Sequence, residues 1–473
     1  MVVTYDELTA RLDNNKVSKF YIAAAIIATM GGLTWGYDAG IIGSTLVFVE
    51  PLFKLNALDV AILVSGTSIL SGLGALTAGP ITDRWGRRIL LIIDAIMYGT
   101  FAILSALATT SFLLLIWRSL IGFSIGADSA IATGYVAEFA PTKSRGRLAI
   151  SQQLMIFIGF TSSFWAGYLL SSSGDWRLMY ALGAVPAIIM LAARFYLPES
   201  PRWLLVSGKV DKAKKVFKRL GMAVDGDIQA PKREATYKEL LHSRVMRRSL
   251  IAIGLYMLFF NTVGGNIILY YGPSIYVYLG LSGSRAILNT AVSESLGAIA
   301  YVLSFMLIDR MGRRKLALIG YGGIAVSLFF MAISLHAFLS GVLGLAVLGV
   351  FISATAFLFF AHTGLYGVGW VVQGEVFPTQ FRGRAGGLIA ADTWFSNWFI
   401  VFLFPIWASL YGDYTFFILT FFIAVAAVIV TYYLLPETKG RSVDQMSFMF
   451  SRSFKTYRKP LENEESGFTH GSK

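Results

Sequence analysis

The chain has 473 residues, of which 56% are hydrophobic and only 14% are charged. Soluble globular domains are usually about 25% charged, so this composition excludes an ordinary soluble domain and indicates a membrane protein. The formal net charge of +13 does not indicate a nucleic-acid partner, because the basic residues cluster in short segments between apolar runs.

Twelve apolar runs are each long enough to cross about 30 Å of hydrocarbon as a helix. The first six cover 20–46, 59–80, 89–108, 111–137, 148–171 and 178–197, and the last six cover 249–277, 286–308, 315–338, 340–372, 385–410 and 413–435. The sequence therefore predicts an all-α membrane protein with 12 transmembrane helices. Short surface helices are expected at 209–220 and 238–247, where charges of both signs follow a helical spacing.

The first run carries one carboxylate, Asp38, with no Lys or Arg close in sequence. Asp38 lies about 18 residues, or ~27 Å, from the inner start of its helix, and Arg118 lies about seven residues, or ~10 Å, below the outer end of the fourth helix. Antiparallel helices would bring both groups to a similar depth, where each charge alone is costly, so we predict an ion pair. Protonation of Asp38 would release Arg118, which makes the pair a candidate proton switch. The alternative is a static ion pair that holds the two helices together.

Glycines in the same run predict how the first helix packs. Gly32, Gly36 and Gly40 form a close-packing face that points away from Asp38, so this face should meet a different helix from the one that carries Arg118.

Further ionisable residues lie within the apolar runs. Asp128 follows Arg118 by ten residues on a different face, and is either a second proton-coupling site or a polar packing group. Glu294 and Asp392 have no obvious partner and are candidates for lining a cavity, whereas Asp94 and His362 are interpreted as structural.

The residue types also indicate which functions to exclude. The sequence contains no cysteine, no cluster with metal-ligand spacing, no nucleophile with a base and no phosphate-binding loop. We therefore expect no enzymatic activity, no cofactor and no metal site.

Three motifs recur in the same order in both halves of the chain. DRWGRR at 83–88 matches DRMGRR at 309–314, EFAPTKSRGR at 138–147 matches EVFPTQFRGR at 375–384, and PES at 198 matches PET at 436. The repeats predict two pseudo-symmetric six-helix bundles, 1–197 and 249–436, joined by a linker at 198–248 and followed by a tail at 437–473. Duplicated bundles of this kind are typical of secondary transporters.

All three motifs fall on the same side of the predicted membrane, together with an excess of Lys and Arg in 201–248. By the positive-inside rule this side is cytoplasmic, which places both termini inside in a multi-pass protein of the cell membrane. The motif charges can pair across helix ends into a network that forms when the inner face closes. Its members would be Asp83, Arg87, Glu138, Arg145, Glu199, Asp309, Arg313, Glu375, Arg382 and Glu437. The alternative is ordinary topology-setting charge.

With these motifs, and with GYDAGIIGS from Gly36, PESPRWL from Pro198, GGNIILYYGP from Gly264 and PETKGRSVDQM from Pro436, the chain resembles the sugar porter family of the major facilitator superfamily over about 20–446. The resemblance implies the 12-helix major facilitator fold and alternating access. It also implies proton-coupled symport of a monosaccharide, with Asp38 as the coupling carboxylate. A monomer in the lipid bilayer is expected, because one chain contains the whole pathway.

The resemblance also implies a substrate site between the bundles. Its positions are Gln153, Asn266, Tyr270, Trp370, Trp394 and Asn397, with Tyr271 as a gating ring and with Asn261 and Glu294 as further candidates. The family's Gln-Gln pair is replaced by Phe260-Asn261, and its Asn on helix 8 by Gly297, so the pocket is less polar than expected. These departures, with Asp128, leave two alternatives open: a proton-coupled symporter of an organic acid or phosphate, and a sugar facilitator without coupling.

Overall fold

The computed structural model describes residues 7–8, 19–139, 142–222, 237–377, 379–439, 446 and 450. Within these ranges the regular structure is helical and no β-strand is found. Twelve helical segments are long and apolar enough to cross a membrane, which confirms the predicted number of spans.

The N-terminal half contains six spans, of which the first and the last are each built from two helices. They are α2 (Lys19–Thr29) with α3 (Gly31–Phe53), α4 (Ala57–Trp85), α5 (Arg87–Ala106), α6 (Ser111–Phe139), α7 (Thr142–Leu170), and α8 (Trp176–Ala181) with α9 (Ala184–Arg194). The first span is longer than the predicted 20–46. Its helix continues through Pro51 and ends only at Lys54, whose φ is 51°.

Three short helices follow in the linker, α10 (Pro201–Val206), α11 (Val210–Arg219) and α12 (Tyr237–His242). The first predicted surface helix corresponds to α11. The second is shorter than predicted, because Ser243 ends it and caps the next helix by accepting a hydrogen bond from the backbone N–H of Met246.

The C-terminal half repeats the arrangement of six spans. They are α13 (Arg244–Thr262) with α14 (Gly265–Tyr278), α15 (Gly283–Met311), α16 (Arg313–Leu339), α17 (Leu343–Phe360) with η1 (Ala361–Tyr366) and α18 (Gly367–Val376), α19 (Thr379–Tyr411) and α20 (Asp413–Leu434). The tenth span thus contains a six-residue π-helix, η1, which the sequence pattern did not predict.

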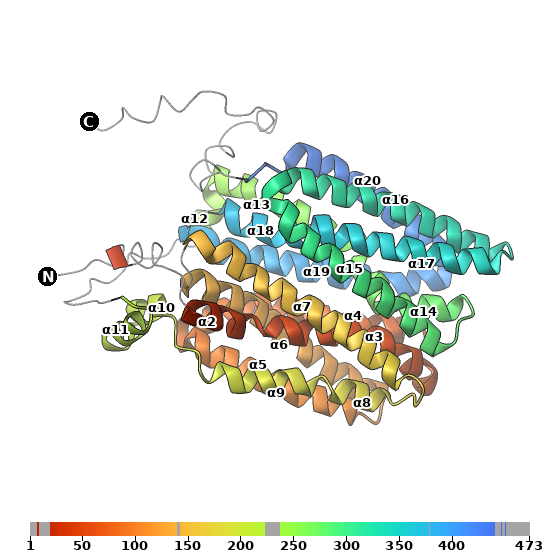
Figure 1. Ribbon diagram of the computed structural model, residues 1–473, viewed down its shortest axis with the longest axis horizontal. Helices are drawn as coiled ribbons and strands as arrows, with labels where there is room; N and C mark the ends of the chain where they lie inside the picture. Colours follow the sequence, from red (N-terminus) through yellow and green to blue (C-terminus); the bar gives the residue numbers. More distant parts are fainter. Residues whose placement is uncertain are drawn as a thin grey trace.

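Figure 1 shows the red-to-yellow helices of the N-terminal half on one side and the green-to-blue helices of the C-terminal half on the other. Helices α10, α11 and α12 lie at one end of the molecule, at the left of Figure 1, which we call the linker end. The opposite end, where α3 ends and α15 begins, we call the far end.

Glycines allow helices of the N-terminal half to pack at backbone distance. A Cβ atom on Gly36 of α3 would collide with the backbone oxygen of Ile156 on α7, and one on Gly126 of α6 with that of Ser71 on α4. The glycine face of the first span is therefore confirmed. It meets α7, while Asp38 meets α6, as expected.

The two halves meet through α4 against α19, α3 against α14, and α7 against α15. At the far end the Ser171 hydroxyl donates to the Ser284 hydroxyl at 2.8 Å, and deeper in the membrane the Trp165 indole N–H donates to Ser295 at 3.0 Å. These contacts join the halves at the far end, so the structure represents a state that is closed there.

Candidate functional site

The predicted ion pair between Asp38 on α3 and Arg118 on α6 is present. Two contacts join the groups, from Arg118 Nη1 to Asp38 Oδ1 at 3.2 Å and from Nη2 to Oδ2 at 3.3 Å, while Nη2 also lies 3.3 Å from the Thr67 hydroxyl. Asp38 is 3% exposed and Arg118 is 1% exposed. A fork-shaped, two-contact arrangement lets each buried charge neutralise the other.

A small cavity adjoins this ion pair and lies between the two halves. Asp38, Arg118 and small polar residues of α4, such as Thr67 and Ser68, line it from the N-terminal half. From the C-terminal half it is lined by Tyr270 on α14 and Trp394 on α19. The ring of Trp394 lies 4.9 Å from that of Trp35 on α3, so two indoles from opposite halves border the cavity.

Three of the predicted amide side chains form a connected chain beside the cavity. The Asn266 amide donates to Asn261 Oδ1 at 3.2 Å and to Asn397 Oδ1 at 2.5 Å. The Asn397 amide in turn donates to Ser68 Oγ of α4 at 2.8 Å, across the interface between the halves. Because Ser68 lines the cavity, this chain reaches the cavity wall.

The other predicted substrate residues, Tyr271, Gln153 and Trp370, do not line the cavity. Tyr271 donates from its hydroxyl to the Val401 carbonyl at 3.0 Å, so α14 is fastened to α19 on the far-end side of the amide chain. Gln153 on α7 is 8% exposed. Trp370 on α18 packs against the apolar core of the C-terminal half. Neither Gln153 nor Trp370 is among the residues that line the cavity.

Asp128 lies inside the N-terminal half and not at the cavity. Its carboxylate pairs with Arg194 at the end of α9, and the same guanidinium reaches Asp94 Oδ2 on α5 at 2.8 Å. Asp94 also accepts from the Ser124 hydroxyl at 2.6 Å. Asp94, Asp128 and Arg194 are 4%, 4% and 0% exposed, so one buried cation holds two buried carboxylates.

The sequence analysis missed Arg194. A lone arginine at the end of an apolar span is usually interpreted as a residue whose charge reaches the membrane surface. The available signal was the count of buried charges. Arg118 is already paired with Asp38. The carboxylates of Asp94 and Asp128 therefore still need a cation, and Arg194 lies within a neighbouring apolar run.

Glu294, the remaining predicted site residue, lies on α15 inside the C-terminal half. The nearest basic group is His362 of η1, whose Nε2 is 3.6 Å from Glu294 Oε1. Asp392 on α19, by contrast, is only half-buried.

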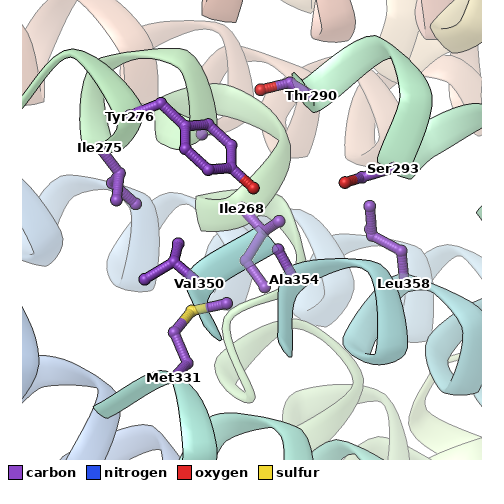
Figure 2. Close-up of a pocket in the computed structure, with 10 residues that line it drawn as sticks. Ile268, Ile275, Tyr276, Thr290, Ser293, Met331, Val350, Ala354 and Leu358 are labelled. Carbon is purple, nitrogen blue, oxygen red and sulfur yellow. The ribbon is translucent and has the colours of Figure 1, made fainter. Parts of the chain in front are cut away.

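A second small cavity lies within the C-terminal half (Figure 2). Its walls are mostly apolar side chains of α14, α16 and α17, with hydroxyl groups from Tyr276, Thr290 and Ser293. Because it has no charged wall and lies inside one half, it does not resemble a transport site between the halves.

At the linker end of the N-terminal half, Arg87 is the centre of a charged cluster. Its guanidinium donates to Glu138 at 3.1 and 2.8 Å and lies 3.1 Å from Asp83. Glu199 accepts from the backbone N–H of Arg87 at 2.9 Å, and Glu138 accepts from the Ser200 hydroxyl at 2.5 Å.

The repeated motif builds the same cluster in the C-terminal half. Arg313 donates to Glu375 at 2.9 Å and to Asp309 at 3.0 Å, and Glu437 accepts from the Arg313 backbone N–H at 2.9 Å. Thr438 donates to Glu375 at 2.5 Å, as Ser200 does to Glu138. The predicted pairing across helix ends is therefore found. No pair of either cluster joins one half to the other, because each cluster takes its residues from one half and from the segment that directly follows that half. The side chains of Arg145 and Arg382 lie outside the described residues.

A glycine makes room for each of the two glutamates that close these clusters. Gly86 and Gly312 have φ values of 98° and 88°, a backbone conformation that residues with a Cβ rarely adopt. A Cβ atom on either would also collide with the carboxylate of Glu199 or Glu437. Burial raises the pKa of Glu199, although three backbone N–H groups and the charge of Arg87 favour its ionised form.

Within the described part of the chain, no group of three or more His, Asp or Glu side chains is arranged to hold a metal ion. The features that remain are a charged pair and an amide chain around a cavity between two repeated halves.

Comparison with known proteins agrees with this geometry. The chain is 31% identical to the glucose transporter GlcP of Staphylococcus epidermidis over 92% of its length and 97% of the relative's. It is 30% identical to the arabinose-proton symporter of Bacillus subtilis, covering 90% of this chain and 94% of that one. A structure of the xylose transporter XylE from E. coli, in a partially occluded inward-open conformation, covers 90% of this chain and 100% of its own, with a TM-score of 0.76 and 23% identity.

The XylE structure shows that the fold is that of a major facilitator transporter. A family description, "Sugar (and other) transporter", matches residues 24–450. The repeated halves, the twelve spans and this match agree, and the chain belongs to the sugar transporter family.

Proposed function

We propose that the protein is a proton-coupled symporter of a monosaccharide that works by alternating access. The observation that carries the proposal is the buried pair of Asp38 and Arg118 at the wall of a cavity between the two halves. A carboxylate that can take up a proton at the edge of a substrate cavity links proton binding to whatever binds there.

The coupling step follows from the charges of the pair. When Asp38 is ionised it holds Arg118 through two contacts, and when it is protonated it no longer neutralises the guanidinium. Arg118 must then satisfy its donors elsewhere, with Thr67 within reach, which changes the free-energy difference between the states of the two halves. Deprotonation to the cytoplasm restores the pair.

The cavity wall favours a sugar as substrate. Sugar hydroxyls need amide and hydroxyl partners. Ser68 lines the cavity, and the amides of Asn266 and Asn397 connect to it through the hydrogen bond from Asn397 to Ser68. The apolar face of a sugar ring packs on aromatic side chains. Trp394 and Trp35 lie at the right place for such a contact. The glucose and arabinose-proton transporters among the relatives support the same substrate class.

The energy available for accumulation can be bounded. One proton moving through ~100 mV supplies ~2.3 kcal/mol, and one pH unit adds ~1.4 kcal/mol. Their sum of about 3.7 kcal/mol supports a concentration ratio of several hundredfold.

The remaining assignments belong to the same proposal. The linker end faces the cytoplasm because it carries the basic motifs, which places both termini inside the plasma membrane. The two halves, 1–197 and 249–436, rock as units about the linker, and the Arg87 and Arg313 clusters keep the helix ends of each half together. The functional unit is a monomer without enzymatic activity.

Uptake into proteoliposomes tests the proposal. Labelled D-glucose, D-xylose and L-arabinose, with one organic acid and phosphate, are offered with and without an inward proton gradient. We expect a sugar to accumulate only with the gradient, and Asp38→Asn to exchange that sugar without accumulating it. The matched control is Asp211→Asn on α11, an exposed carboxylate that should behave as wild type.

Three results would overturn the proposal in different ways. Gradient-independent uptake that Asp38→Asn leaves unchanged would make the protein a facilitator with a static ion pair. Accumulation of the acid or phosphate alone would change the substrate class. Uptake of no solute would remove the transport assignment altogether.

A further inference from the structure

Glu294 is a buried carboxylate that has no role in the proposed coupling by Asp38 and Arg118. It is 0% exposed, and neither of its side-chain oxygens has a hydrogen-bond partner among the described residues. An ionised carboxylate without donors is very costly inside a membrane protein. In this conformation Glu294 therefore either holds a proton or shares one with a neighbouring group.

The neighbouring group is His362, which is also 0% exposed. Its Nδ1 lies 2.6 Å from the Leu358 carbonyl, and a carbonyl can only accept a hydrogen bond, so Nδ1 carries the hydrogen. In neutral histidine the other nitrogen, Nε2, is then a free acceptor. Nε2 has no hydrogen-bond partner and lies 3.6 Å from Glu294 Oε1.

This arrangement accommodates one proton between the two groups. Either the carboxyl keeps it and faces a neutral imidazole, or the imidazole takes it and faces a carboxylate, and both forms are neutral as a pair. Loss of the proton leaves a bare buried carboxylate. Gly297, one turn beyond Glu294, provides the space, since a Cβ atom there would lie 2.7 Å from His362 Nδ1.

The cover over this pair comes from the other half of the molecule. Phe157 on α7 packs its ring edge-on against His362 at 4.4 Å and lies 4.3 Å from the ring of Tyr301. Because Phe157 belongs to the N-terminal half, a rocking motion that separates α7 from α15 uncovers the imidazole. His362 also lies in the π-helix η1, and such segments occur often at functional sites.

The other titratable groups around the pair are phenols. They are Tyr301 on α15 and Tyr366 on η1, with Tyr270 on α14 and Tyr321 on α16 close to Tyr366. The element that covers the pair, α7, contributes the uncharged Phe157. Phenols ordinarily titrate near pH 10, so within the described surroundings Glu294 and His362 are the groups whose ordinary pKa values lie below 7.

We propose that Glu294 and His362 form a second proton-binding site, within the C-terminal half, which is covered by Phe157 when the far end is closed. Proton binding at this site stabilises the far-end-closed state, and loss of the proton favours separation of the halves. The site is distinct from Asp38 and Arg118, so it would act even in a protein whose substrate is not a sugar.

The test uses distances between spin labels and needs no substrate. The chain has no native cysteine, so Leu107→Cys and Leu343→Cys place one label on each half at the far end, both at exposed positions. In lipid nanodiscs, the ratio of far-end-closed to far-end-open protein is measured between pH 5 and pH 9. One linked proton changes this ratio by up to about tenfold per pH unit, in favour of the closed state at low pH.

Glu294→Gln mimics the protonated carboxyl and should remove this contribution, so that the closed state is favoured more than in wild type at high pH and only the pH dependence from Asp38 remains. Phe157→Ala, which leaves both titrating groups in place, should lower the pH of the midpoint by wetting the carboxylate. Asp38→Asn and Asp211→Asn serve as controls, and both should keep the Glu294 contribution.

A Glu294→Gln protein with the wild-type pH dependence would overturn the inference, as would a Phe157→Ala protein with an unmoved midpoint. Either result would leave the Asp38 proposal intact. Conversely, failure of sugar uptake would not alter these distances, so the two proposals fail separately.

Discussion

The two halves carry nearly the same charged cluster at the linker end but different chemistry within the membrane. Arg87 and Arg313 each contact an aspartate one turn earlier and a glutamate on a neighbouring helix, and each backbone N–H donates to a second glutamate. In the interior, the N-terminal half contains full charges, whereas the C-terminal half contributes amides, rings and one pair that can be neutral.

This difference distinguishes a structural task that both halves share from functional tasks that belong to one half each. Both must keep their helix ends together while they move, and a motif that forms an ion cluster serves that purpose in either half. Proton exchange and sugar recognition need different groups, so the interiors are free to diverge. On this basis the N-terminal half carries the proposed coupling charge, and the C-terminal half carries most of the amides that we propose for sugar binding.

The largest effect is expected from removing the cation on which the N-terminal interior depends. Arg194→Leu leaves Asp94 and Asp128 buried without a positive partner, and breaking a buried ion pair in this way costs about 3–5 kcal/mol. We expect a large fall in unfolding temperature and in the yield of monodisperse protein in detergent.

The double variant Arg194→Leu with Asp128→Asn should recover part of this loss, because only one carboxyl then needs a proton. A single Arg194→Leu variant as stable as wild type would show that the two carboxylates are already neutral. Asp94 and Asp128 would then be protonated in the folded protein, as we infer for Glu294 in the closed state.

A smaller effect tests the likeness of the two linker-end clusters. Glu138→Gln neutralises a carboxylate with two Arg87 contacts, and Glu375→Gln neutralises one with a single Arg313 contact at the corresponding position. Hydrogen bonds to charged groups contribute about 1.5–3 kcal/mol when buried and less when partly exposed, as here. Both variants should unfold at lower temperature, with Glu138→Gln the more affected.

Thermal unfolding of the two variants in the same detergent measures this difference. Exposed Asp59→Asn is unsuitable as a control because Asp59 completes the capping box of α4, so Asp211→Asn is used instead. If Glu375→Gln left the unfolding temperature unchanged while Glu138→Gln lowered it, the two clusters would have the same geometry, but only the Arg87 cluster would stabilise its half.

The smallest effect concerns the contact between the halves near the far end. Trp165→Phe keeps the ring but loses the hydrogen bond to Ser295, which contributes about 0.5–1.5 kcal/mol. The ratio of far-end-closed to far-end-open protein should fall two- to tenfold, as measured with the same pair of spin labels. Tyr196→Phe, at an 80% exposed position, is the control and should leave the ratio unchanged.

Much of the fold followed from the sequence because its signals are local or repeated. Apolar runs longer than the membrane is thick can only be helices there, so the number of spans was determined by composition. The motifs predicted two similar halves, and the cost of lone charges in lipid predicted the pair of Asp38 and Arg118. The glycine face of the first span gave its close contact with another helix.

The partners of the remaining buried groups were decided only by the tertiary structure. Whether Asp128 meets Arg194 or the cavity depends on how α6 and α9 are rotated against each other, and apolar helices without a polar face carry no pattern that sets this rotation. The π-helix η1 changes the face of the span on which His362 lies, and no periodicity in the sequence predicted this π-helix. The free-energy cost of burying a lone charge is evident from the sequence, so the sequence determined which groups need a partner. Which partner each group contacts depends on how helices far apart in the sequence pack, so only the tertiary structure decided it.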